Sequence, residues 1–120
     1  MNKGTVKDIK IINAWKGIMT EGTGSLTIDN VEIVDACYGI HIAEAKNAED
    51  TVLIQNCTID IQWANSFTGG DYALVIKNNV FASTNPYYSD YGAPVVNTYS
   101  TNTTVEENVF EENTKIYVRT

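Results

Sequence analysis

An eight-residue pattern recurs along this 120-residue chain and constrains its fold more than any other feature. The clearest copies are residues 26–33 (LTIDNVEI), 52–59 (VLIQNCTI) and 74–81 (LVIKNNVF). A fainter copy covers residues 103–110, and residues 9–13 resemble the first half of an earlier copy. One unit this short cannot bury its own apolar side chains, so the pattern predicts successive copies that stack on one another.

Within each copy the apolar residues alternate, as they do in a strand with one buried face. The alternation slips by one residue after Asn30, Asn56 and Asn78, which predicts a bend between two short strands. Asn13 and Glu107 are expected at the same corner in the first and last copies. Asparagine suits this corner because it tolerates left-handed backbone and its amide can bond to an amide stacked above it. We therefore expect an interior ladder of asparagine side chains.

Copies stacked about 4.8 Å apart would share hydrogen bonds between strands and enclose a continuous apolar core. Residues 38–42 are expected to form a third strand of each turn, with counterparts at residues 17–18 and 94–96. The inward positions form three columns: Leu26, Val52 and Leu74; Ile28, Ile54, Ile76 and Val105; Ile33, Ile59, Phe81 and Phe110.

Composition limits the partners. Fifteen acidic residues against eight basic ones give a net charge of −7, which argues against nucleic acid and anionic membranes, since both require a concentrated positive surface. No apolar run is long enough to span a membrane, and residues 1–5 lack the apolar core of a signal peptide. Because residues 116–118 still have strand character, we expect residues 1–120 to be one domain, part of a longer protein.

The two cysteines, Cys37 and Cys57, occupy different positions of the repeat. They are therefore not expected to stack directly, and they are interpreted as small apolar fillers rather than as a disulfide or a metal-binding pair.

The three clear copies, the asparagine column and the strand at residues 38–42 together resemble the right-handed parallel β-helix, pectate-lyase-like superfamily. The resemblance implies an all-β, right-handed parallel β-helix (solenoid) of about four to five coils with an Asn ladder. It also implies a secreted or cell-surface location. Its members range from polysaccharide lyases and hydrolases to adhesins and non-catalytic domains, so the fold alone does not decide the function.

The catalytic motifs that the resemblance would imply are missing. The chain has no Asp-Asp pair, its one histidine lies in Ile40-His41-Ile42, and its one arginine is Arg119. Catalysis would therefore depend on His41 as a general base, oriented by Glu44 or Asp35. The alternative is that His41 is an ordinary strand residue at the solvent edge.

Two stretches lengthen the interval between copies, at residues 62–72 and 82–93, and both should leave the coil at the same edge. Their aromatic side chains suit stacking on the C–H face of a sugar ring. The alternative is that these rings fold back and cover the side of the coil. The ligand-binding candidates are Trp63, Phe67, Tyr87, Tyr88 and Tyr91.

Asp71 and Asp90 lie beside turns and are the only candidates for calcium, but they lack the spaced carboxylates of a calcium loop, and ordinary turn aspartates are the alternative. No other cofactor is expected.

The leading hypothesis is a non-catalytic or catalytically incomplete domain of an extracellular carbohydrate-active or surface protein, with polysaccharide contacted through aromatic loops. The second is a structural or adhesive spacer that stacks on flanking coils or on other copies through its open ends. The third is a polysaccharide lyase or glycoside hydrolase.

Overall fold

The computed structural model describes residues 3–22, 24–43, 47–84, 93–111 and 114–118. Every regular element in this part of the chain is a β-strand, and all the strand pairs are parallel. The strands are β1 (Lys3–Lys7), β2 (Lys10–Ile12), β3 (Lys16–Thr20), β4 (Ser25–Asp29), β5 (Glu32–Ile42), β6 (Thr51–Gln55), β7 (Thr58–Lys77), β8 (Val80–Ala82), β9 (Ala93–Glu106), β10 (Val109–Phe110) and β11 (Thr114–Val118).

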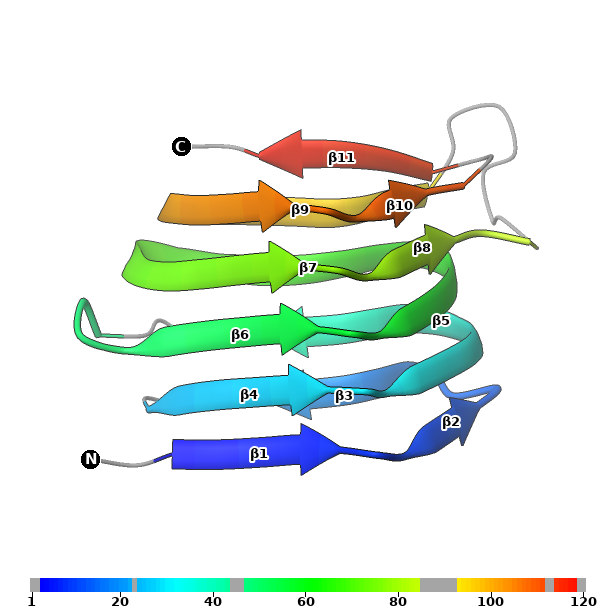
Figure 1. The fold of residues 1–120 in the computed structure, drawn as a ribbon, viewed down its shortest axis with the longest axis horizontal. Helices are drawn as coiled ribbons and strands as arrows, with labels where there is room; N and C mark the ends of the chain where they lie inside the picture. Colours follow the sequence, from blue (N-terminus) through cyan, green and yellow to red (C-terminus); the bar gives the residue numbers. More distant parts are fainter. Residues whose placement is uncertain (1–2, 23, 44–46, 85–92, 112–113, 119–120) are drawn as a thin grey trace.

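The chain winds into a solenoid in which each turn lies on the one before it (Figure 1). On one face β1 pairs with β4, β4 with β6, β6 with the end of β7, and the end of β7 with the end of β9. The predicted stacking of copies is confirmed residue by residue, since Leu26 pairs with Val52 and Val52 pairs with Leu74.

The second and third faces of the coil also follow the expected register. Ile33 pairs with Ile59, and Ile59 pairs with Phe81. The third strand is confirmed as well, because Ile18 pairs with Ile40 and Ile42 pairs with Phe67. Three turns are described without a break inside them, and the later ones cross residues 85–92 and 112–113, which lie outside the described part. The fully described turns thus number about three, fewer than the four to five expected.

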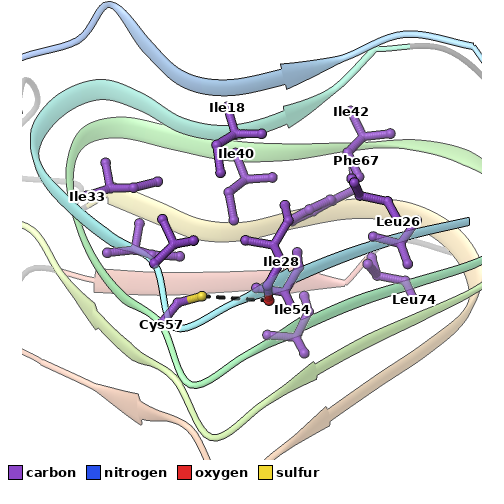
Figure 2. Packing of buried hydrophobic residues seen from close by; sticks show 14 of the residues in the cluster. Ile18, Leu26, Ile28, Ile33, Ile40, Ile42, Ile54, Cys57, Phe67 and Leu74 are labelled. Carbon is purple, nitrogen blue, oxygen red and sulfur yellow. Dashed lines mark hydrogen bonds between the residues drawn. The ribbon is translucent and has the colours of Figure 1, made fainter. Parts of the chain in front are cut away.

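The inward columns form the apolar core (Figure 2). Ile28, Ile33 and Ile59 have no exposed surface, and Ile54 and Ile76 are nearly as deeply buried. Val105 is half-buried, and Phe110 has 38% of its surface exposed; within the described part of the chain, Phe110 stacks on Phe81. Burying an aliphatic side chain of this kind stabilises a fold by about 1.5–3 kcal/mol, so these columns supply the main stabilisation.

The corner residue of the first turn is Asp8 rather than Asn13, which corrects the prediction. Lys7 pairs with Asp29, so Asp8 falls opposite Asn30, and both have positive φ, 58° and 52°. Asn13 also has positive φ, 57°, but it belongs to the next corner of the same turn, where its backbone N–H bonds to the Val34 carbonyl. Aspartate and asparagine both tolerate this conformation, so residue type alone did not distinguish the two corners.

The column of corner asparagines exists, but it is exposed rather than interior. The Asn30 amide donates to Asp8 Oδ1 at 2.9 Å, and the Asn78 amide donates to Asn56 Oδ1 at 2.6 Å. Between them, the Asn56 amide bonds to the carboxylate of Asp29 at 2.9 Å. This outer column links one coil to the next at the surface.

A second pair of amides lies one residue further on, at the buried Asn79 and the half-buried Asn108. The Asn79 amide donates to Asn108 Oδ1 at 3.0 Å and to the Ile54 carbonyl at 3.0 Å. Its Oδ1 accepts from the Cys57 backbone N–H at 2.9 Å. Asn79 therefore satisfies two backbone groups that would otherwise be buried without a partner, the Cys57 N–H and the Ile54 carbonyl.

The two cysteines are free thiols. Cys57 is buried, and its Sγ lies 3.1 Å from the Gln55 carbonyl oxygen and 3.8 Å from that of Ile28 (Figure 2). Cys37 is half-buried.

Residues 62–72 do not form a loop. This corrects the expectation that this stretch leaves the coil at one edge. They belong to β7, a 20-residue strand that runs from the second face of one turn into the first face of the next. Phe67 and Tyr72 point inward, and the Tyr72 hydroxyl donates to the Thr68 carbonyl at 2.7 Å. The extra residues are used to cover the core at the point where β7 changes coil.

Candidate functional site

Three aromatic side chains from successive coils lie together on the outside of the solenoid. The rings of Tyr38 and Trp63 stack with centroids 5.5 Å apart and an interplanar angle of 17°. Trp15 approaches Tyr38 edge to face, with centroids 5.9 Å apart. We call Trp15, Tyr38 and Trp63 the aromatic ladder. Both ring geometries are among those that aromatic pairs prefer.

Irregularities in strand pairing create the ladder. Val34 and Asp35 on one coil face the single residue Asp60 on the next, because Ile33 pairs with Ile59 but Ala36 pairs with Ile61. At the next irregularity the extra residue lies on the other strand. Gln62 and Trp63 face the single residue Cys37, since the next aligned pair is Tyr38 with Ala64. Bulges of this kind re-aim side chains locally.

The small side chain of Cys37 leaves a hollow between the two tryptophans. Lys16 pairs with Tyr38, so Trp15 and Cys37 are neighbours across the strands, and Trp63 lies on the far side of Cys37. Two strand spacings, about 10 Å, thus separate the tryptophan backbones. The resulting groove has a volume of about 750 Å³. Its lining residues are Asn13, Ala14, Trp15, Asp35, Cys37, Gln62 and Trp63.

The polar wall of this groove is pre-arranged. The Gln62 amide donates to Asp35 Oδ1 at 3.0 Å across the two coils. Asp35 lies at a corner with φ of 53°, and the bond from Gln62 orients its carboxylate. Asn13 adds a further amide to the groove lining. The groove therefore offers donors and acceptors beside flat apolar rings.

A second groove of about 490 Å³ lies on the other side of the ladder. Lys16, His41 and Ser66 contribute its polar groups, and Trp15, Tyr38 and Trp63 line it as well. The Lys16 ammonium lies 5.9 Å from the centroid of the Tyr38 ring, within the range of a cation–π interaction. The ladder is therefore a ridge with a carboxylate and amides on one side and a cation on the other.

His41 occupies an outward position between the buried residues Ile40 and Ile42, as expected from the sequence. Its ring centroid is 6.2 Å from that of Tyr38. Burial lowers the pKa of His41, and the nearby positive charge of Lys16 lowers it further. The His41 Nδ1 atom is buried and makes no hydrogen bond in the described structure.

The catalytic pairing of His41 with an acid has little support in this geometry. The Asp35 carboxylate bonds to Gln62 and faces the first groove, whereas His41 lines the second. Glu44 lies outside the described residues. General-base catalysis by His41 therefore stays a prediction from the sequence, without an orienting carboxylate among the described bonds.

The structure separates the aromatic candidates. Trp63 is part of the ladder and lines both grooves. Phe67, by contrast, is only 2% exposed and packs in the core, so it cannot stack against a ligand; its assignment to a binding loop was wrong because residues 62–72 form a strand. Tyr87, Tyr88 and Tyr91 lie outside the described residues.

Trp15 and Tyr38 were missed as binding candidates. Trp15 is 67% exposed, and Tyr38 was placed in a strand without a functional role. Gly17 and Gly39 are equivalent in the third strand of two turns, but aligning them sets Trp15 beside Cys37 and Lys16 beside Tyr38. The two rings are therefore offset by one position, and the repeat pattern gave no signal that they meet.

Of the two calcium candidates, Asp71 alone lies in the described part of the chain. The Asp71 carboxylate accepts from the Thr101 hydroxyl at 2.7 Å. No group of three or more histidine, cysteine, aspartate or glutamate side chains in the described part of the chain is placed to hold a metal ion. Asp90 lies outside that part, so calcium stays an untested prediction.

The family to which the chain belongs follows from these features and from a direct comparison. The family model described as "Right handed beta helix region" matches residues 1–119. The chain belongs to this family, and its solenoid is right-handed. No curated protein and no solved structure matches the chain at the significance required.

Among the described residues, no helix has the length and apolar character needed to cross a membrane.

Proposed function

We propose that this β-helix domain binds a polysaccharide along the aromatic ladder, in a secreted or cell-surface setting, without catalysing its cleavage. The observation that carries the proposal is the alignment of Trp15, Tyr38 and Trp63 on three successive coils, with a groove on each side. A linear glycan repeats along its length, and so does this surface.

Trp15 is the main platform in this proposal. It is the most exposed of the large apolar side chains described, and it meets Tyr38 edge to face. Tyr38 has a supporting role, because Trp63 stacks on its ring and the Lys16 ammonium lies over it. The stack holds the ladder in one conformation before ligand arrives, which reduces the entropic cost of binding.

The polar groups beside the ladder determine which glycans fit. Asp35, Gln62 and Asn13 present carboxylate and amide groups that can bond sugar hydroxyls, while Lys16 and His41 lie on the opposite side. A few fixed polar groups beside an apolar surface are typical of small-molecule and sugar sites. The negative net charge of the chain favours neutral polysaccharides over strongly anionic ones.

Affinity electrophoresis in gels containing neutral or acidic polysaccharides tests the proposal. At least one neutral polysaccharide should retard the wild-type chain. Trp15→Ala and Trp63→Ala should each weaken the affinity about tenfold or more, since truncating an aromatic anchor commonly costs more than 1 kcal/mol and 1.4 kcal/mol is a factor of ten.

Val109→Ala is the matched control. Val109 is an exposed apolar residue, 55% accessible, outside both grooves, so its loss should leave retardation unchanged. Circular dichroism of each variant verifies that it is folded. Retardation that persists in both tryptophan variants, or its absence in every polysaccharide, would exclude the aromatic ladder as the binding surface. Reducing-end release by the wild-type chain that disappears in His41→Ala would overturn the non-catalytic part.

A further inference from the structure

The two grooves beside the aromatic ladder carry opposite charges. Among the residues described in the lining of the first groove, Asp35 is the only charged side chain. The described lining of the second groove contains no acid, and Lys16 and His41 are its basic residues. The ladder therefore separates a side that attracts cations from a side that attracts anions.

The Asp35 carboxylate keeps one oxygen for a ligand. The Gln62 amide donates to Oδ1 at 3.0 Å, and in the part of the chain that the structure describes this is the only bond to the carboxylate. A carboxylate can accept several hydrogen bonds through its two oxygens, so a donor in the groove can still bind to Oδ2. Asp35 is also half-buried, and solvent ions screen a partly buried charge less than an exposed one.

The two indole rings that line the first groove favour the same kind of ligand. Trp15 lies on the coil before Cys37 and Trp63 on the coil after it, so the two tryptophans flank the groove about 10 Å apart at the backbone. Tryptophan attracts a cation more strongly than any other aromatic side chain, and aromatic rings in proteins bind organic ammonium groups in this way. A ligand with an ammonium group can therefore contact the indoles and the carboxylate together.

Other sugar substituents match this groove less well. An anionic sugar would place its charge against Asp35, and a neutral sugar would leave the Asp35 charge without a partner. The net charge of −7 on the whole chain also attracts cations.

We propose that the first groove binds the ammonium group of an amino sugar, with Asp35 as the charge partner and with Trp15 and Trp63 on either side. This inference rests on the proposed polysaccharide binding and adds to it that glycans with protonated amino groups bind more tightly than neutral ones. N-acetylation removes the positive charge of the amino group, so the acetylated form of the same glycan should bind less tightly.

Isothermal titration calorimetry of the full chain with short oligomers of glucosamine and of N-acetylglucosamine tests the proposal. The solution should have low ionic strength and a mildly acidic pH, so that the amino groups are protonated. The wild-type chain should bind the glucosamine oligomer about tenfold more tightly than the acetylated one. Added salt should reduce this difference.

Asp35→Asn is the decisive variant. Asparagine tolerates the φ of 53° at this corner and keeps an Oδ1 acceptor for Gln62, so the variant removes the charge and little else. Its affinity for the glucosamine oligomer should fall to that for the acetylated oligomer, which should stay unchanged. Circular dichroism verifies that the variant is folded.

Asp8→Asn is the matched control. Asp8 has a φ of 58° and accepts the Asn30 amide at 2.9 Å, so this variant removes the same charge from a similar corner. Asp8 is not among the lining residues described for either groove. The preference for the glucosamine oligomer should therefore persist in Asp8→Asn.

The amine site and the proposed function can fail separately. The amine site is overturned by a wild-type chain that does not prefer the glucosamine oligomer, by a preference that survives in Asp35→Asn, or by an equal loss of preference in Asp8→Asn. If Trp15→Ala still weakens binding of the acetylated oligomer in these cases, polysaccharide binding along the ladder stands without an amine site. Affinities for both oligomers that are unchanged in Trp15→Ala and Trp63→Ala would reject the ladder itself, and the amine site with it.

Discussion

Gly39 shows how closely the third face of the solenoid is packed. A Cβ atom at this position would overlap Asn65 Oδ1 and would lie 2.9 Å from Ile61 Cγ2 and 3.0 Å from Ile59 Cγ2. The Asn65 oxygen is held in place because it accepts the Ile40 backbone N–H at 2.7 Å. The absence of a side chain at Gly39 is therefore what allows Asn65 to bond the coil below it.

Gly39→Ala should lower the free energy of unfolding by about 1–3 kcal/mol, the usual cost of overpacking a rigid interior. Gly4→Ala is the matched control, since its Cβ would lie at an ordinary 3.6 Å from Leu26 Cδ1, and we expect it to change stability by less than about 0.5 kcal/mol. Urea denaturation of both variants makes the comparison. Equal unfolding free energies for the two variants would show that Asn65 can move away from a Cβ atom at residue 39 at little cost.

At the scale of single elements, neighbouring asparagines at the end of β7 have different tasks. Asn78 is exposed and bonds a side chain on the coil below, while Asn79 is buried and bonds both the Cys57 N–H and the Ile54 carbonyl. The sequence pattern predicted the column that contains Asn78, but it placed that column in the interior, where the structure has Asn79. Both columns are amide-rich, and only the direction of each side chain distinguishes them.

Asn79→Ala should cost more than about 2 kcal/mol of unfolding free energy, because each buried backbone group left without a partner costs about 1–3 kcal/mol. Asn78→Gly is the control, since glycine readily adopts the positive φ of 57° at this corner. This variant should lose less than about 1 kcal/mol of unfolding free energy. Urea titrations of the two variants test the difference. A larger loss in the Asn78 variant would reverse the assignment of the two columns.

The strand β7 also explains why the aromatic ladder was only partly foreseen. Its residues 62–72 were expected to leave the coil, because they lengthen the interval between two copies of the repeat. In the structure Trp63 points out, whereas Phe67 and Tyr72 point in. The pairing of β5 with β7 shifts by one residue three times, the last time between Tyr38 and His41. Shifts of one residue leave no clear mark in the sequence.

At the scale of the whole molecule, Tyr72 links stability to pH. Its side chain is fully buried, and burial raises its pKa to about 12 from an ordinary value of 10.0. Below pH 10 both the folded and the unfolded chain keep the phenol proton, so this residue adds no pH dependence. Above pH 10 the unfolded chain releases the proton first, so stability falls as the pH rises towards 12.

The unfolding free energy should therefore fall above pH 10 by up to about 1.4 kcal/mol per pH unit through Tyr72. Tyr72→Phe removes the hydroxyl that bonds the Thr68 carbonyl, so this variant should start less stable and show a shallower alkaline slope. Urea titrations of both proteins between pH 9 and pH 12 measure the slopes. Parallel slopes would show that Tyr72 is not the group responsible.

The sequence by itself determined the stacking of the repeats, the inward columns and the third strand, because each depends on local alternation and on a corner that recurs in every turn. Only the tertiary structure decided that Asp8 rather than Asn13 begins the corner column, that Phe67 is buried, and that Trp15 and Tyr38 meet Trp63. These outcomes depend on single-residue bulges between neighbouring coils. A shift of one residue exchanges the inner and outer faces of a strand, and only the packing of one coil on the next fixes where it occurs.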